Sequence, residues 1–145
     1  MKIKHFLHLF IVVLISLTFS CSSDTNSLQA TDFSLEKSLY NLSYGANNQQ
    51  VFDLYLPANR NPSTTKTLIL IHGGGWTSGD KADMNYVVNI IKQYLPNYAI
   101  ANINYRLATV GNPAFPMQIN DIESVVSKLK NENYGISDQF GFIGL

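Results

Sequence analysis

A run of three glycines between a histidine and a tryptophan, His72-Gly-Gly-Gly-Trp76, is the most specific chemical feature of this sequence. Glycine has no side chain, so consecutive glycines let the backbone turn with positive φ and approach a bound molecule closely. Backbone N–H groups aimed at one point stabilise the negative charge that develops on a carbonyl oxygen during acyl transfer. The run therefore predicts a loop that binds an oxyanion through its main chain.

Two other interpretations of the glycine run remain open: a plain glycine-rich connection, or a loop that binds phosphate at a helix N-terminus. The glycines are not followed by the Lys-Ser/Thr pair of a P-loop, and they lack the spacing of a dinucleotide-binding fingerprint. Lys81 lies too far along the chain to replace the P-loop lysine. The oxyanion interpretation is favoured.

The run directly follows residues 67–71, a short apolar segment typical of a strand buried on both faces of a parallel sheet. Residues 39–44 and 51–56 are rich in β-branched and aromatic residues with rough alternation, which predicts a hairpin. Residues 98–105 predict another buried strand, and residues 140–145 begin a further one.

Apolar residues at the three-four spacing of one helix face predict two helices between these strands. The apolar positions are Met84, Val87, Val88, Ile91, Tyr94 and Leu95 in the first, and Ile119, Ile122, Val125, Val126 and Leu129 in the second. Asp80 or Asp83 is expected to cap the first helix, and Gly135 to end the second. A hairpin followed by strand-helix-strand-helix-strand predicts an α/β fold with a sheet of mixed direction.

Four segments around the glycine run resemble the esterase/lipase branch of the α/β-hydrolases, and feruloyl and acetyl-xylan esterases are similar. The segments are His72-Gly-Gly-Gly-Trp76, Gly79-Asp-Lys81, Tyr105-Arg-Leu107, and Phe115-Pro116 with Asp121. The resemblance covers about residues 50–145. It implies the N-terminal part of an α/β-hydrolase sheet and serine-dependent hydrolysis of carboxylic esters, without a cofactor.

The resemblance also implies roles for individual residues. The backbone amides of Gly74 and Gly75 would be the oxyanion donors. Three neighbours would shape the loop: His72, Gly73 and Trp76. Arg106 and Asp121 would support the surrounding loops and would not react with substrate.

The resemblance also implies a role for Gly144. The nucleophile of these hydrolases lies in a Gly-x-Ser-x-Gly turn at the end of the fifth strand. Gly144 would be the first glycine and Leu145 the variable residue, so the serine would follow Leu145. The alternative is that residues 140–145 form a strand in which Gly144 is incidental.

A histidine to act as general base is also missing from the expected mature chain. His5 and His8 lie in the predicted signal peptide, which leaves only His72, expected to form structural hydrogen bonds. A Ser-His-Asp triad needs histidine as the base, and α/β-hydrolases place the acid and the histidine after the serine. We therefore expect residues 1–145 to supply the oxyanion loop without nucleophile, acid or base, and to be inactive alone.

Residues 1–20 have the pattern of a secretory signal peptide. Lys2 and Lys4 give a positive start, and residues 6–19 are mostly apolar. A helix that spans a bilayer needs about 20 apolar residues, so cleavage is favoured over the alternative of an uncleaved signal anchor.

Cys21, the only cysteine of the chain, follows this stretch and precedes a polar segment. The arrangement resembles a bacterial lipoprotein signal, although Thr18 stands where such signals usually have an aliphatic residue. The resemblance implies a lipid-carrying Cys21, export, and anchoring to the bacterial cell envelope. Residues 21–32 would form the lipidated tether and residues 33–145 a partial α/β-hydrolase domain. Simple secretion with a free thiol is the alternative.

Composition limits the classes of partner. Without Lys2 and Lys4, eight basic residues face ten acidic ones, and no cluster of basic residues remains to bind nucleic acid. Histidine, cysteine and carboxylates show no metal-ligand spacing. The expected partners are a small-molecule or polysaccharide-linked ester and a membrane reached through the lipid anchor. A non-catalytic surface lipoprotein that binds carbohydrate or protein is the competing hypothesis.

Overall fold

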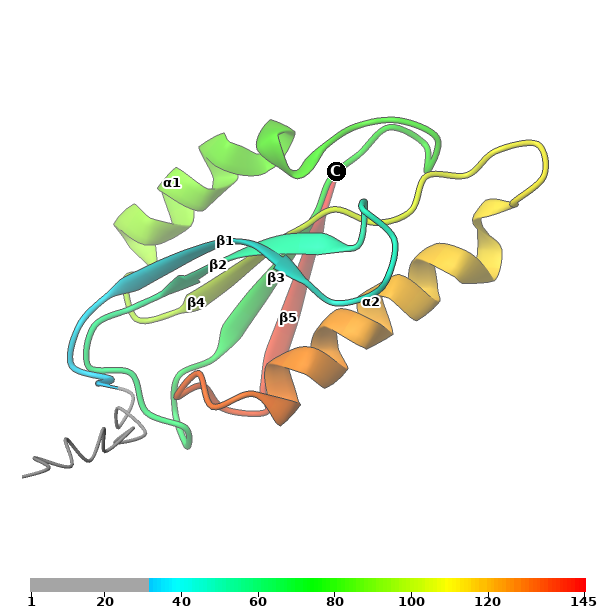
Figure 1. Ribbon diagram of the computed structural model, residues 1–145. Coiled ribbons are helices and arrows are strands. Elements are labelled where there is room, and N and C mark those ends of the chain that lie inside the picture. The colour runs from blue at the N-terminus through cyan, green and yellow to red at the C-terminus, as the bar shows by residue number, and fades with distance from the viewer. Residues whose placement is uncertain (1–31) are drawn as a thin grey trace, which may run out of the picture.

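The computed structural model describes residues 32–145 (Figure 1). The predicted signal peptide, Cys21 and all but the last residue of the expected tether lie outside the described residues. The elements in chain order are β1 (Lys37–Ser43), β2 (Val51–Leu56), β3 (Thr67–Ile71), the 3-10 helix η1 (Lys81–Met84), α1 (Asn85–Tyr94), β4 (Ala99–Ile103), α2 (Ala114–Asn131) and β5 (Phe140–Gly144).

The strands form one five-stranded sheet in the order β1-β2-β4-β3-β5. β1 and β2 form the antiparallel hairpin expected from their sequences, and β2 pairs antiparallel with β4. β3 lies between β4 and β5 and is parallel to both. The mixed sheet with α/β connections confirms the expected fold class.

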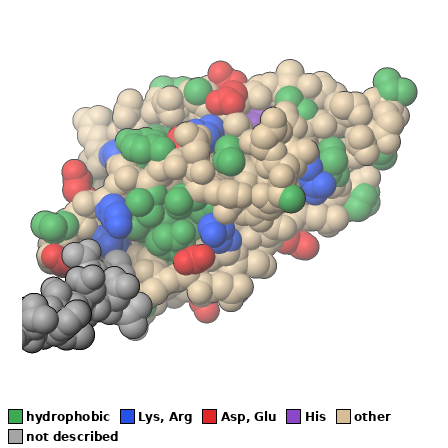
Figure 2. Space-filling view, viewed as in Figure 1, with side chains coloured by type: hydrophobic (Ala, Val, Ile, Leu, Met, Phe, Trp, Pro, Cys, Tyr) green, Lys and Arg blue, Asp and Glu red, His purple; other side chains and the backbone are tan. Residues whose placement is uncertain are grey.

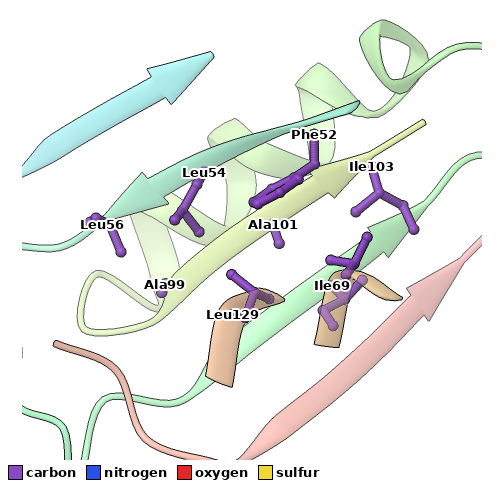
Figure 3. Close-up of a cluster of buried hydrophobic side chains, with 9 residues drawn as sticks. Phe52, Leu54, Leu56, Ile69, Ala99, Ala101, Ile103 and Leu129 are labelled. Carbon is purple, nitrogen blue, oxygen red and sulfur yellow. The ribbon is translucent and has the colours of Figure 1, made fainter. Parts of the chain in front are cut away.

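The two helices cover opposite faces of the sheet (Figure 1). On one face, side chains of β2, β3 and β4 pack against Val125 and Leu129 of α2 (Figure 3). On the other face, Val88 and Ile91 of α1 pack against Leu70 of β3. Successive side chains of a strand point to opposite faces, so the apolar residues of β3 and β4 serve both layers. The two polar residues of these strands are Thr67 and Asn102.

The first helix differs from its expected pattern at both ends. It begins as η1, whose N-cap is Asp80, and Asp83 completes a capping box, so both candidate aspartates contribute. Met84 is buried as expected, but Tyr94 and Leu95 are 70% and 42% exposed. Leu95 has left the helical conformation, with φ of −129°, and its side chain therefore no longer continues the apolar stripe.

The second helix buries polar residues within its inner face. Gln118 and Asp121 are buried there, whereas Ile119 is 42% exposed, contrary to the expected stripe. Both polar side chains have hydrogen-bond partners in the loop after β4, which makes their burial tolerable. The helix ends at Asn131, so Gly135 is not its C-terminal stop; the positive φ of Gly135, 72°, belongs to the turn that leads to β5.

The described surface shows no concentration of one charge in the view of Figure 2. Basic side chains lie scattered among acidic and apolar ones on this face. Within residues 32–145, none of the helices combines the length and apolar character needed to cross a bilayer.

Candidate active site

The glycine run lies in a loop of residues 72–79, called here the glycine loop, between β3 and η1. It stands at the edge of the sheet where the parallel strands β3, β4 and β5 end, the edge at which open α/β sheets bind their ligands. The C-terminal end of β5 lies beside this loop (Figure 1). The amide of Leu145 donates to the carbonyl of Ile71 at 3.3 Å. A Cβ placed on Gly73 would lie 2.9 Å from the Leu145 carbonyl oxygen, so the two segments are in contact.

Three consecutive residues of the glycine loop have positive φ: Gly74 at 109°, Gly75 at 58° and Trp76 at 68°. The carbonyl of Gly74 accepts from the amides of Thr77 and Ser78 at 3.1 and 3.2 Å and closes a tight turn. A Cβ on Gly74 would clash with the Ser78 carbonyl, whereas a Cβ on Gly75 would meet nothing within 4 Å. Positive φ in a bulky residue such as Trp76 stores strain, which proteins keep mostly at functional sites.

The amides of Gly74 and Gly75 are available as donors. No hydrogen bond among residues 32–145 uses either of them, and both residues are exposed. Backbone donors held in a fixed turn can stabilise a developing oxyanion without reorganising during the reaction. The two glycines chosen from the sequence thus have the donor groups that the expected role requires, and the role itself stays a prediction.

His72 holds the start of the glycine loop. The whole residue is 2% exposed. Its ring stacks on Tyr105 with 4.2 Å between ring centroids and forms a hydrogen bond through Nδ1 with the carbonyl of Gly73 at 2.8 Å. The Tyr105 hydroxyl donates to the His72 carbonyl at 2.8 Å. Burial raises the pKa of Tyr105, which keeps this hydroxyl protonated as a donor. Trp76 also contacts Tyr105, at 5.4 Å between centroids, so one tyrosine of the loop after β4 supports both ends of the glycine run.

The exit of the glycine loop is bound to the sheet by polar contacts. Asn104 donates to Asp80 Oδ2 at 2.8 Å and accepts from the Lys81 amide at 2.5 Å. Lys81 Nζ lies 2.6 Å from Asp53 Oδ2 on β2. Nothing in the sequence marks Asp53 or Asn104, because one lies in β2 and the other just after β4, and no local pattern shows that both meet the loop exit.

Asp80 gives a stability contribution that depends on pH. The Ala82 amide, followed by the Asn104 side chain, holds the pKa of Asp80 below its ordinary value. A carboxylate with a lowered folded-state pKa stabilises the fold fully above its unfolded pKa of about 3.9, and this contribution is lost as pH falls through the folded pKa. Asp80→Asn keeps a capping side chain but removes the charge. We expect the stability difference between wild type and Asp80→Asn in urea denaturation to shrink as pH falls from about 6 to about 3; a difference that is constant with pH would refute this.

The Asp53–Lys81 pair is expected to stabilise the loop exit. The two side chains are 9% and 14% exposed, so the pair is more buried than a surface salt bridge. Lys81→Met leaves Asp53 without its cation and should lower the free energy of unfolding by about 2 kcal/mol, the contribution of a hydrogen bond to a charged group. Lys66, which is exposed, offers a matched control, and Lys66→Met should change it by less than about 0.5 kcal/mol. Equal effects of the two substitutions in urea denaturation would contradict this role.

Arg106 and Asp121 lie together beside the loop after β4, in keeping with the supporting role that the resemblance implied. Asp121 is fully buried and accepts from the Arg106 guanidinium at 2.6 Å, from the Arg106 amide at 2.8 Å and from Gln50 Nε2 at 2.9 Å. The hydrogen bond to Asp121 raises the pKa of Arg106 above its ordinary value. Gln118 Nε2 donates to the Arg106 carbonyl at 2.7 Å. Nothing in the sequence indicated these contacts of Gln50 and Gln118, which are only polar residues beside apolar ones.

A match to a known protein family decides to which family the chain belongs. The sequence model of the BD-FAE family matches residues 52–144, well over half of the chain. The chain belongs to the BD-FAE family. A search of curated protein sequences finds no significant match.

Several solved structures similar to this BD-FAE chain are esterases. Esterase B from Lactobacillus rhamnosis, inhibited by a tributyrin phosphonate, is 30% identical with a TM-score of 0.58, over 75% of this chain and 36% of that one. A truncated carbohydrate esterase from gut microbiota is 22% identical with a TM-score of 0.60, over 80% and 41%. A bacterial heroin esterase is 21% identical with a TM-score of 0.52, over 78% and 35%. The chain thus spans about two fifths or less of the length of these relatives and matches the N-terminal part of their α/β-hydrolase fold.

No group of three or more metal-ligating side chains comes together within the part of the chain that the structure describes.

Proposed function

We propose that this BD-FAE chain forms the oxyanion-binding part of a serine carboxylic ester hydrolase. The observation that carries the proposal is the pair of unused amides of Gly74 and Gly75 in a turn of positive φ. The glycine loop contacts the end of β5 through Ile71 and Gly73, and the resemblance puts the nucleophile just after that strand end. An ester carbonyl bound at these amides would be attacked by a serine that follows Leu145, with the acid and the base histidine supplied by later residues.

The substrate is proposed to be a small-molecule ester or an ester linked to polysaccharide. The esterase neighbours support the first class, and one of those neighbours, the truncated carbohydrate esterase, is in keeping with the second. Export and a lipid anchor at Cys21 are also proposed, on the pattern of residues 1–21 alone. The comparisons do not favour the competing hypothesis of a non-catalytic binding lipoprotein.

Hydrolysis of p-nitrophenyl acetate tests the proposal. The full protein encoded by the locus, purified without its signal peptide, should hydrolyse the ester and be inactivated by a serine-directed phosphonate. Residues 22–145 alone should give the buffer rate, because they include no serine nucleophile with a histidine base. Absence of hydrolysis by the full protein on a panel of aryl and alkyl esters would refute the proposed function. Hydrolysis by residues 22–145 would refute the proposal that the nucleophile, the acid and the base lie outside these residues.

A further inference from the structure

A groove, called here the α1 groove, lies at the end of the sheet where β1 begins, β2 ends and α1 ends (Figure 1). It encloses about 340 Å³, within the usual size of ligand sites, about 300–1,000 Å³. β3 is five residues long and leads from this end of the sheet to the glycine loop, so roughly 15 Å separate the two. The α1 groove is therefore distinct from the proposed oxyanion site.

The floor of the α1 groove is apolar and partly aromatic. Leu56 of β2 and Ile100 of β4 are buried there, and Tyr55 and Tyr98 are partly exposed. Tyr40 packs edge-on against Tyr55, with 6.0 Å between ring centroids, and extends the aromatic surface onto β1. Burial raises the pKa of Tyr55, so its hydroxyl stays protonated and uncharged. Such a floor suits the C–H groups on the face of a sugar ring.

The rim of the α1 groove is polar, and the fold does not use its side chains. No hydrogen bond or ion pair within residues 32–145 involves the rim side chains, which are those of Glu36, Ser38, Asn59, Lys92 and Asn97. The ammonium of Lys92 lies 4.3 Å from the centre of the Tyr55 ring, which places a donor above the floor. One carboxylate and one ammonium balance in charge, and the other rim groups are neutral. The rim therefore favours a neutral ligand with several hydroxyl groups.

A buried arginine holds the wall of the α1 groove in place. Arg60 is 4% exposed, and its guanidinium donates to the carbonyls of Leu35 at 2.6 Å and Pro57 at 3.3 Å. Leu35 precedes Glu36, and Pro57 leads into the turn that contains Asn59. These contacts fix the backbone beside two rim residues before a ligand arrives, which lowers the entropic cost of binding.

A larger groove between β1 and α2 differs in this respect. It encloses about 570 Å³, but the hydroxyls of Ser43 and Ser124 donate to backbone carbonyls at 2.7 and 2.8 Å. Lys128 in its wall pairs with Glu132 at 3.3 Å. Several of its polar groups thus already have partners within the fold, whereas the rim of the α1 groove keeps its polar groups for a ligand.

We propose that the α1 groove binds a neutral sugar unit of a polysaccharide. The floor contacts the C–H face of the sugar ring, and Glu36, Lys92 and Asn97 bind its hydroxyl groups. The groove is an attachment point away from the proposed reaction. That the same polysaccharide carries the ester rests on the proposed hydrolase function, whereas the binding itself does not.

Binding is tested by NMR on the whole 145-residue chain. The probes are cellotetraose, xylotetraose and mannotetraose, with tetraalanine as a peptide control. We expect at least one sugar to shift the side-chain amide signals of Asn59 and Asn97 saturably, while tetraalanine leaves them unchanged. Trp76, the only tryptophan, reports on the glycine loop, and its indole signal should not move. No saturable shift with any sugar, an equal response to tetraalanine, or a shift confined to Trp76 would overturn the proposal.

Asn97→Ala and Glu36→Gln test the location of the sugar. Each weakens one hydrogen-bonding group of the rim and should lower the affinity for the sugar about three- to tenfold. Asn89→Ala and Glu123→Gln are the matched controls outside the α1 groove and should leave the affinity unchanged. All four residues are exposed, so the variants should keep the fold, which the dispersion of the amide spectrum checks. Unchanged affinity in either rim variant would overturn the proposal.

Kinetics of the proposed full-length hydrolase test whether the bound sugar belongs to the substrate. The substrate is the soluble acetylated polysaccharide made of the sugar that binds. Asn97→Ala should raise its KM about three- to tenfold and leave KM for p-nitrophenyl acetate unchanged, because that ester carries no sugar. Unchanged KM for the polysaccharide would overturn the link between groove and substrate. Failure to hydrolyse any ester would refute the proposed function, and the NMR titration would then decide on the α1 groove by itself.

Discussion

Gly74→Ala is expected to lower kcat of the proposed full-length hydrolase about 100- to 1,000-fold, the cost of losing one oxyanion donor. A Cβ at this position would clash with the carbonyl of Ser78, and φ of 109° is unsuited to an L-residue. The turn must therefore open, which moves the amides of Gly74 and Gly75 away from the position of the oxyanion. KM should change much less than kcat, because the lost interaction is made mainly in the transition state.

Gly75→Ala is the matched control for this substitution. The added methyl group would meet no atom within 4 Å, and the cost is limited to placing alanine at φ of 58°. That cost is about 1–2 kcal/mol, and the N–H donor is retained. We expect kcat to fall less than about tenfold. Equal losses in the two variants, or full activity of Gly74→Ala in a folded protein, would contradict the assigned role of the turn.

Asp121→Ala is expected to lower the free energy of unfolding by about 3–5 kcal/mol, the largest stability effect predicted for this chain. The carboxylate is fully buried and accepts hydrogen bonds from Arg106 and Gln50. In the alanine variant these donors have no acceptor. Urea denaturation measures the loss.

Two substitutions on the same helix serve as controls for Asp121→Ala. Asp121→Asn keeps the shape and one acceptor and should cost less than the alanine variant. Glu123→Ala removes an exposed carboxylate two residues away and should change stability by less than about 0.5 kcal/mol. A loss below about 1 kcal/mol for Asp121→Ala would mean that the buried network does not stabilise the loop after β4.

The strands of the fold could be predicted from sequence because their patterns are local. The apolar segment at residues 67–71 corresponds to β3, and residues 51–56 correspond to β2. β1 follows its expected pattern less well, because its register shifts between Leu39 and Leu42, where Asn41 has φ of 53°. A bulge of this kind exposes residues that strict alternation would bury.

The supports of the site could not be predicted, because they depend on contacts between distant residues. Lys81 meets Asp53, and Gln50 meets Asp121, only after the sheet has formed. Gln118 lies where the helical period favours an apolar residue, and its burial makes sense only with the Arg106 carbonyl beside it. The glycine loop could be predicted because its conformation depends on consecutive residues and not on contacts between distant ones.

The most direct test of the central claim is the sequence of the locus beyond codon 145. The proposal that Gly144 opens a nucleophile turn beside the glycine loop predicts that the next codons encode Ser-x-Gly, with an aspartate or glutamate and then a histidine further downstream. Any other residue directly after Leu145, or a stop codon there, would contradict the proposal that this loop and this strand end form the two halves of a serine hydrolase site.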